Sequence, residues 1–444
     1  MVSPQPGSPK PGSPKPAVGD RLELDTVNVA HGGYVVARKD GFVVFVRGAL
    51  PDERVVAEVT DVKTSHAFAE TVEVLAPHPE RRVAPCPAFH AFGCGGCDFQ
   101  HASYPLQLRM KTAVLREALS RHGRLPDDRV DELTAEGVLP LGPQTRWRSR
   151  MRFGVVRGVD GQMVPALRAH RSSRRVAADH CTIADSDVLT EAMRCARDAG
   201  DEDVIVVAKG DDGARAQVGD SLEGARVRHR LDVEGHPIDF RVPLEGFWQA
   251  EPRLVPALVD AVVEFGGVRP GQHWWDLYAG VGPLAAALGA RVTDRDAADG
   301  ADSPGSVQAV EGVASAVSAA KRALHAMPWV RLHEADVREW LARASVRGAG
   351  RDADGRADDC PDGLSGVVLD PPRSGAGAEV IDAIVATGAP VIVYVACDPV
   401  ALGRDAARLE QHGYRLTRLR AWDAFAQSHH FETVAAFERE DQIS

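Results

Sequence analysis

The second half of the chain alternates short apolar runs with alanine-rich stretches, and this alternation limits the possible fold more than any other feature. The apolar runs include HWWDLY, GVVLDPP and PVIVYVACDP, all within residues 251–444. Apolar strands that alternate with helical segments are typical of a parallel sheet covered by helices. We therefore predict an α/β domain over 251–444, with its ligand crevice at the carboxyl ends of the strands.

The N-terminal part has a different pattern. Residues 18–76 form short runs of alternating apolar and polar residues, broken by Gly-Gly, Asp-Gly and Leu-Pro-Asp. This pattern predicts a small antiparallel β-barrel. Residues 1–17 repeat PGSPK and lack the apolar segment of a signal peptide, so we expect a disordered tail.

Residues 77–250 combine a cysteine-rich stretch with several strand-like runs and predict a central α/β domain. We expect a helix at about 104–121 that packs on the C-terminal domain. Two segments, 294–306 and 348–363, are rich in Asp, Gly and Ala and are predicted to be flexible surface loops. Cys360 lies in the second of them and is given no role.

Charge and hydropathy restrict the partners. The formal net charge of −11 argues against a generally basic nucleic-acid binder. One local exception runs from residue 146 to residue 175, where Asp160 is the only acid among nine arginines. A surface that contacts RNA phosphates is favoured there over an ordinary solvated sheet face, with these candidate residues: Arg146, Arg148, Arg150 and Arg152. No apolar run reaches eighteen residues, so we expect a cytoplasmic protein without membrane spans, and a monomer.

The seven cysteines do not form the even, regular framework of a disulfide-bonded protein, so we expect reduced thiols. Three of them, Cys86, Cys94 and Cys97, lie in CPAFHAFGCGGCDFQH, where Gly95-Gly96 lets the backbone turn tightly. Cys181 is the best candidate for a fourth ligand, because Cys195 lies in a predicted helix. Four thiolates suit either a [4Fe-4S] cluster or a zinc ion. The spacing is not that of radical enzymes, so a fully ligated structural cluster is preferred.

The segment WWDLYAGVGPLA predicts a strand, a glycine turn and a helix, in which Gly280 and Gly282 let the backbone approach a ligand. This turn alone does not distinguish a methyl-donor site from a dinucleotide site. Acids that follow at later strand ends favour a class I methyltransferase. Glu311 could accept hydrogen bonds from both ribose hydroxyls, and Asp336 could accept one from an adenine amino group. Asp370 begins a stiff Asp-Pro-Pro loop.

Arg373 follows this Asp-Pro-Pro, where amino-group methylases of this fold usually carry an aromatic residue that stacks on the target base. The acceptor is therefore expected to be something other than an exocyclic nitrogen. Carbon-5 of uracil is a poor nucleophile until a thiolate adds to carbon-6, and Cys397 in YVACDPVALGRD is the candidate thiol. Asp398 is expected to face the backbone or the base. Glu432 is the candidate base, with His430 on the same face if this segment is a strand.

Several phrases together closely resemble the TrmA/RumA-type family of RNA uracil-5-methyltransferases: CGGCDFQH, WRSRMRF, FWQ, DLYAGVGPLA, DPPRSGAG, YVACDPVALGRD and HFETVAAFER. The N-terminal AHGGYVVARKDGFVVFVRGALPDERV resembles the TRAM domain, an OB-like RNA-binding module. The resemblance implies a multidomain fold of TRAM barrel, central domain with a [4Fe-4S] cluster and Rossmann-like catalytic domain. It also implies that Cys397 is the nucleophile, that Glu432 is the general base, and that S-adenosylmethionine contacts Gln249, Tyr278, Glu311 and Asp370.

The sequence departs from this family in its first cluster spacing, which concerns Cys86, and in Glu251, which replaces an asparagine. The segment 294–306 also lengthens the loop before Glu311. We expect ribosomal RNA, most simply 23S rRNA, as substrate, with tRNA as the alternative. The rivals are an amino-group methyltransferase and an RNA-binding iron-sulfur protein with an inactive methylase domain.

Overall fold

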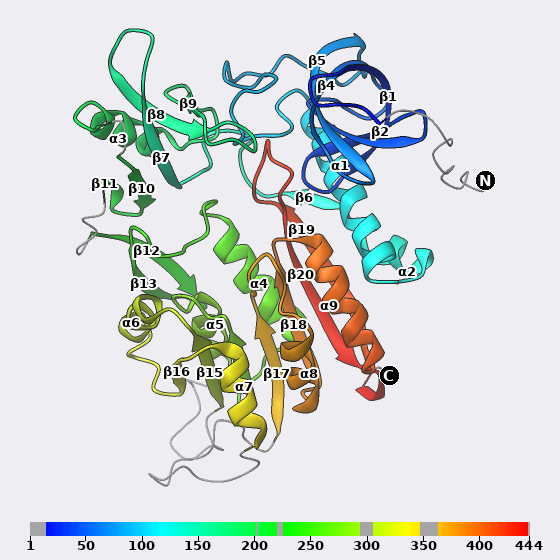
Figure 1. Cartoon of the computed structure of the whole chain (residues 1–444). Coiled ribbons are helices and arrows are strands. Elements are labelled where there is room, and N and C mark those ends of the chain that lie inside the picture. The colour runs from blue at the N-terminus through cyan, green and yellow to red at the C-terminus, as the bar shows by residue number, and fades with distance from the viewer. Residues whose placement is uncertain (1–14, 201–202, 220–224, 294–304, 347–362, 443–444) are drawn as a thin grey trace.

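The structure, a computed structural model, describes residues 15–200, 203–219, 225–293, 305–346 and 363–442. Residues 1–14 of the expected tail, 294–304 of the first acidic segment and 348–362 of the second lie outside the described residues, and so does Cys360. The N-terminal barrel and the central sheet lie side by side at one end of a larger C-terminal sheet (Figure 1).

Five strands close into the predicted N-terminal barrel in the order β1-β2-β3-β5-β4, and β3 and β5 are parallel where the sequence predicted an antiparallel barrel. They are β1 (Arg21–Ala30), β2 (Tyr34–Lys39), β3 (Phe42–Arg47), β4 (Arg54–Val62) and β5 (His66–Ala76). Alternate residues such as Val44 and Val46 fill the barrel interior, because successive side chains of a strand face opposite sides. Asp52, in the turn where related modules carry glycine, has φ 58°, a left-handed conformation that glycine adopts more easily.

The central domain is built on a five-stranded sheet of order β11-β10-β7-β8-β9. Its strands are β7 (Arg150–Arg157), β8 (Met163–Arg168), β9 (Arg175–Ala177), β10 (Ile205–Gly210) and β11 (Gly213–Val218). Helix α3 (Ser186–Ala196) packs on this sheet and buries Cys195 there. The hairpin of β12 (Arg226–Val233) and β13 (His236–Pro243) connects this sheet to the C-terminal domain.

Eight strands form the C-terminal sheet in the order β16-β15-β14-β17-β18-β20-β19-β6. They are β14 (His273–Leu277), β15 (Ser306–Glu311), β16 (Val330–Glu334), β17 (Leu364–Leu369), β18 (Val391–Ala396), β19 (Tyr414–Asp423), β20 (Glu432–Arg439) and β6 (Val138–Pro140). The first five in this order are parallel, whereas β20 is antiparallel to β18. The first residue of β20 therefore lies at the edge where the parallel strands end.

Helices cover both faces of this sheet, as the near-continuous apolar strands require. One apolar core joins the sheet to α4 (Leu254–Gly266), α5 (Pro283–Arg291) and α6 (Ala314–Ala323). A second core joins it to α7 (Val337–Val346), α8 (Ala378–Ala386), α9 (Pro399–Gln411) and α1 (Tyr104–Glu117). The remaining helical segments are short: η1 (Ala118–His122), α2 (Asp127–Leu133) and η2 (Glu440–Gln442).

Helix α1 precedes the catalytic domain in the sequence but packs into its core. Its N-terminus is capped by Ser103, whose side chain accepts a hydrogen bond from the N–H of Leu106 at 3.2 Å. Gly403 of α9 lets that helix approach η1, the segment that continues α1. A Cβ at Gly403 would lie 2.6 Å from the carbonyl oxygen of Ala118 in η1. No helix in the described ranges has both the length and the apolar character that crossing a membrane requires.

Candidate active site

Strand register brings three of the predicted donor-site residues together. Leu277 at the end of β14 pairs with Val310 of β15 on one side and with Leu369 of β17 on the other. The next residue of each strand, Tyr278, Glu311 or Asp370, therefore lies at the same edge. This edge holds the carboxyl ends of the parallel strands, where open α/β sheets bind their ligands.

A cavity opens beside these strand ends. Its lining includes Gln249, Tyr278, Gly280 and Asp370, together with the aromatic side chains of Phe247 and Trp248. Gly280 has φ 57° and Gly282 has φ 91°, so both use the left-handed region that glycine tolerates. Tyr278 has φ 64° although it carries a side chain, and strained backbone of this kind is concentrated at functional sites.

Glu311 and Asp336 are not part of the lining of this cavity, and both hold backbone turns. The Glu311 carboxylate accepts hydrogen bonds from the N–H of Gly280 at 2.9 Å and of Val313 at 2.7 Å. Asp336 accepts from the N–H of Arg338 at 3.0 Å, at the start of α7. Each carboxylate oxygen can accept more than one hydrogen bond, so both residues can still bind ligand hydroxyl or amino groups. Burial and the nearby Asp336 carboxylate raise the pKa of Tyr278 to about 12.

Asp276 is a further acid near these strand ends, and no role is predicted for it from the sequence. It lies inside β14, is fully buried, and neither carboxylate oxygen accepts a hydrogen bond of normal geometry within the described residues. Burial and the neighbouring carboxylates of Asp370 and Glu311 raise its pKa well above the usual range. An unpaired buried acid costs free energy unless a cation or a hydrogen-bond donor reaches it. In the sequence, the signal for Asp276 is an acid inside an apolar strand that leads into a glycine turn.

Register also places the candidate nucleophile opposite the candidate base. Ala396 at the end of β18 pairs with Thr433 of β20, so the next residue, Cys397, comes opposite Glu432. Glu432 is buried and Cys397 is half-buried. Burial, Glu432 and Asp370 raise the pKa of the Cys397 thiol to about 12, while the Arg373 guanidinium acts in the opposite direction. The thiol therefore lies among the groups that the uracil mechanism requires, and it is protonated in the free protein at neutral pH.

The acids next to Cys397 share this buried environment. Burial raises the pKa of Asp370 to about 7. Burial and Asp370 raise the pKa of Glu432 well above its usual range, against the lowering effect of Arg373. Like charges that lie close together in a dry site cannot all ionise at once, so these carboxyls are only partly ionised at neutral pH.

Asp398, directly after the thiol, faces away from it as expected. Its side chain accepts from the N–H of Ala401 at 2.9 Å and caps the N-terminus of α9. The other oxygen lies 3.2 Å from Nε2 of His31, in the turn between β1 and β2 of the barrel. His430 differs from the expectation: β20 begins at Glu432, so His430 precedes the strand and does not share a strand face with Glu432.

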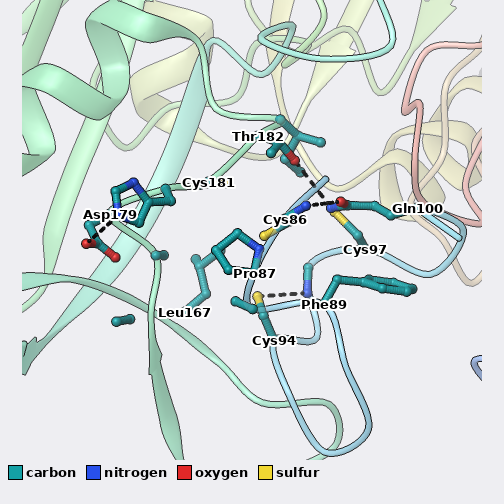
Figure 2. A pocket seen from close by; sticks show the side chains of 16 residues that line it. Cys86, Pro87, Phe89, Cys94, Cys97, Gln100, Leu167, Asp179, Cys181 and Thr182 are labelled. Atoms are coloured by element: carbon teal, nitrogen blue, oxygen red, sulfur yellow. Dashed lines mark hydrogen bonds and ion pairs between the residues drawn. The ribbon is translucent and has the colours of Figure 1, made fainter. Parts of the chain in front are cut away.

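The four cysteines predicted to bind a metal line a single enclosed cavity. Its lining includes Cys86, Cys94, Cys97 and Cys181, which Figure 2 labels around the pocket. The N–H of Gly96 donates to Sγ of Cys94 at 3.4 Å. Burial, and after it the neighbouring thiols, raise the pKa of Cys97 and Cys181. Within the described part of the chain, no three His, Cys, Asp or Glu side chains are arranged to hold one metal ion.

The arginines expected to contact RNA have different surroundings. Arg150 donates to the carbonyl oxygens of Pro243 and Leu244, at 3.3 and 2.5 Å, and so holds β13. Arg148 is also largely buried, and its surroundings include Cys181 and Cys97 as well as Arg373. Arg146 and Arg152 are exposed, but Nη1 of Arg146 donates to the carbonyl oxygens of Cys181 and Ala184, at 3.1 and 3.4 Å. Alternation along β7 would put Arg150 and Arg152 on the same face, because they are two residues apart, so Arg150 is covered through its tertiary contacts with Pro243 and Leu244.

Glu251 stands where the resembling family has an asparagine. It is buried, accepts from the N–H and from the guanidinium of Arg253, each at 3.1 Å, and its pKa is raised by burial. Because its carboxylate is already paired, Glu251 supports the start of α4. Gln249, two residues earlier, lines the donor cavity itself.

Comparisons with known proteins agree with this geometry. Residues 192–440 match the family described as tRNA (Uracil-5-)-methyltransferase, and residues 18–72 match the TRAM domain. An uncharacterized RNA methyltransferase of Streptomyces coelicolor is 36% identical over 458 residues, which cover 95% of this chain and 93% of that relative. The 23S rRNA (uracil(1939)-C(5))-methyltransferase RlmD of Alkalilimnicola ehrlichii is 31% identical over 471 residues, covering 95% and 97%.

A solved structure shares the fold. The crystal structure of Pyrococcus abyssi tRNA (uracil-54, C5)-methyltransferase in complex with S-adenosyl-L-homocysteine superposes with a TM-score of 0.62. The match covers 93% of this chain and 99% of that chain, at 18% sequence identity. The arrangement of barrel, central domain and catalytic domain is therefore common to both proteins.

Proposed function

The chain belongs to the tRNA (uracil-5-)-methyltransferase family, and we propose that its substrate is a uridine of 23S ribosomal RNA. The family and the relatives identify an RNA uracil-5-methyltransferase that uses S-adenosylmethionine. One observation supports the chemistry below more than any other: strand register brings the thiol of Cys397 opposite Glu432, beside the cavity that Asp370 lines.

In the proposed mechanism, the thiolate of Cys397 adds to carbon-6 of the uracil. The new carbon–sulfur bond moves the electron pair of the carbon-5–carbon-6 double bond into an enolate. The thiol proton must leave first, and the neighbouring carboxylate of Asp370 is the acceptor, so that Glu432 stays free to act as the base of the last step. Arg373 assists, because its positive charge lowers the pKa of both Cys397 and Glu432.

Carbon-5 of the enolate then attacks the methyl group of the sulfonium, so a carbon–carbon bond forms and the methyl–sulfur bond breaks. S-adenosylhomocysteine leaves. Glu432 removes the carbon-5 proton, the double bond forms again, and the Cys397 thiolate leaves carbon-6. Glu432 and Cys397 act together in this last step, which explains why they must lie opposite one another.

The acids around the donor cavity suit a cationic donor. Asp276, Glu311 and Asp370 affect one another electrostatically, and burial raises the pKa of Asp276 and Asp370. A positively charged sulfonium beside them would stabilise their ionised forms. Loss of that charge on methyl transfer would weaken this interaction and favour release of S-adenosylhomocysteine. We propose that Gln249 and Tyr278 contact the donor together with Asp370, and that Glu311 and Asp336 bind its ribose and adenine.

We propose that Cys86, Cys94, Cys97 and Cys181 hold a [4Fe-4S] cluster. Each cysteine of such a cluster binds a different iron, so the thiols must surround a cavity rather than converge on one point. The enclosed cavity with four thiols in its lining fits this requirement better than it fits a single zinc ion. The cluster would have a structural role here, because four thiolate ligands leave no open iron position for the donor.

The barrel offers a surface for unpaired RNA bases. The rings of Phe45 and Phe68 stack with centroids 5.6 Å apart on its outer face, and His66 packs edge-on against both. The guanidinium of Arg171, from the central domain, lies 4.0 Å from the Phe68 ring centroid. Half-buried aromatic rings with an arginine beside them are typical of single-strand binding faces on OB-like barrels.

Nucleoside mass spectrometry of separated 23S rRNA and tRNA, from cells with and without the gene, tests the substrate. Loss of 5-methyluridine from 23S rRNA alone is the expected result. Loss from tRNA alone would establish the alternative substrate. If 5-methyluridine is unchanged in both pools and the purified protein forms no adduct with either RNA, the inactive-methylase alternative replaces the proposal.

A further inference from the structure

The loop between β19 and β20, residues 424–431, leads directly into Glu432 and has few internal hydrogen bonds. In Figure 1 this loop rises from the catalytic sheet toward the barrel and the central domain. Its backbone is held mainly by residues from elsewhere in the sequence. Gln427 exchanges hydrogen bonds with Gln107 of α1, and the carbonyl oxygen of His430 accepts from Nζ of Lys111 at 2.8 Å.

The strongest attachment comes from the residue directly after Cys97. Oδ2 of Asp98 accepts from the backbone N–H of His429 at 3.0 Å and lies 2.7 Å from Nδ1 of the same residue. The backbone N–H groups of Asp98 and Phe99 both donate to the carbonyl oxygen of Gln427, at 2.8 and 3.0 Å. Asp98 is buried, so these bonds form away from solvent, where hydrogen bonds to charged groups are strong.

Asp98 is itself fixed to the cysteine-rich loop. Arg47 of the barrel donates to the carbonyl oxygens of Cys94 and Cys97, at 3.2 and 2.8 Å. The same guanidinium lies 3.7 Å from Oδ1 of Asp98 and 3.3 Å from Glu70. One oxygen of the Asp98 carboxylate, Oδ1, thus lies near Arg47, which holds the cysteine-rich loop. The other oxygen, Oδ2, binds His429 in the loop that leads into Glu432.

We propose that Asp98 is a positioning residue that transmits the fold of the cysteine-rich loop to Glu432, and that disturbing it slows release of the RNA from Cys397 more than methyl transfer. The proposal rests on the mechanism above, in which Glu432 removes the carbon-5 proton. Addition and methyl transfer depend on Cys397 and the donor cavity, both built on strands that Asp98 does not contact. Elimination depends on Glu432, which directly follows the loop that Asp98 holds.

The test compares single-turnover methylation with the amount of covalent enzyme–RNA adduct on denaturing gels. Asp98→Ala removes the one oxygen, Oδ2, that contacts both the backbone N–H and Nδ1 of His429, so the adduct should accumulate and decay about 10- to 100-fold more slowly, while methyl transfer to the RNA changes little. Asp98→Asn retains one oxygen acceptor and should behave more like the unaltered enzyme. His429→Ala breaks the same link from the other side, leaves Arg47 and Asp98 in place, and should also accumulate adduct.

A general effect on folding would have a different signature. It would lower methylation and adduct in proportion, and that result for both Asp98→Ala and His429→Ala would overturn the proposal. Glu432→Gln is the positive control, since it should trap the methylated adduct directly. If the unaltered enzyme and Glu432→Gln both fail to form an adduct on any RNA, the proposed mechanism fails, and this outcome is distinct from failure of the Asp98 link alone.

Discussion

The carboxylate of Asp398 lies 3.2 Å from Nε2 of His31, so the residue after the nucleophile is bound to the first turn of the N-terminal barrel. Although burial alone would raise the pKa of Asp398, its hydrogen bonds with His31 and Ala401 hold that pKa below the usual value. The Asp398 charge in turn raises the pKa of Cys397. The barrel, which we expect to contact the RNA, therefore also supplies, through His31, a hydrogen-bond partner for the Asp398 carboxylate beside the thiol.

His31→Ala should reduce the rate of adduct formation, because Asp398 loses a hydrogen-bond partner that stabilises its charge, and this charge then disfavours the thiolate more strongly. Both side chains are partly exposed, so the effect should be small, at most about fivefold or ~1 kcal/mol. Rapid-quench measurement of the enzyme–RNA adduct at saturating RNA checks this. His31→Gln, which can still donate a hydrogen bond, is the matched control. A loss confined to RNA affinity would contradict the assignment.

Turnover should rise with pH between about 6 and 8. The pKa of Asp370 is about 7 and that of Glu432 is raised, so the buried carboxyls hold protons below this range and lose them as pH rises. Glu432 must be ionised to act as a base, which gives an increase of about tenfold per pH unit on the acid side. Asp370→Asn removes a charge that raises the pKa of Glu432, so the rate profile should move to lower pH. A profile that is flat from pH 6 to 8 would contradict this.

Arg373→Ala should make the thiol less reactive. The guanidinium lowers the pKa of Cys397, so its removal should shift the pH dependence of Cys397 alkylation upward. Alkylation by iodoacetamide, followed by peptide mass spectrometry at the Cys397 peptide, measures this without RNA or donor. Arg373→Lys keeps the charge and should shift the profile less. An unchanged alkylation profile in Arg373→Ala would show that the guanidinium does not act on the thiol.

Lys111→Met should destabilise the protein by about 3–5 kcal/mol, because it leaves the buried Asp423 carboxylate without its cation. Nζ of Lys111 lies 2.5 Å from Oδ1 of Asp423, and both side chains are fully buried. Urea unfolding followed by circular dichroism measures the loss. The double variant Lys111→Met/Asp423→Leu removes both charges and should recover much of the stability. If it is no more stable than Lys111→Met, the ion pair is not the cause.

The sequence was sufficient for the catalytic sheet and for its strand ends. Apolar runs that end in Asp370 or in Cys397-Asp398 predict positions at one edge of a parallel sheet, and the structure brings these residues to that edge. It also contained the signal for the barrel, in which β1–β2, β2–β3 and β4–β5 are local hairpins, although the pairs β1–β4 and β3–β5 that close it are not. The family, the fold and the enzyme class predicted from these motifs are confirmed.

Contacts between distant segments could not be predicted in the same way. The pairs His31–Asp398 and Asp98–His429 join residues more than three hundred positions apart, and no local pattern encodes such a contact. The arginine-rich stretch suggested a continuous charged surface, yet Arg150 is turned inward to two carbonyl oxygens. Its partners lie on β13, a hairpin whose position relative to β7 depends on tertiary packing rather than on composition.

The bond between Cys397 and the RNA is the most direct test of the mechanism. Intact-mass analysis under denaturing conditions should be performed after mixing the enzyme, S-adenosylmethionine and a 23S rRNA fragment that carries 5-fluorouridine, which has no carbon-5 proton to remove. The account predicts a stable adduct whose mass equals protein, RNA and one methyl group, mapped by peptide sequencing to Cys397 and absent from Cys397→Ala. Methylation of the natural RNA by Cys397→Ala at an undiminished rate, or an adduct at any other residue, would contradict it.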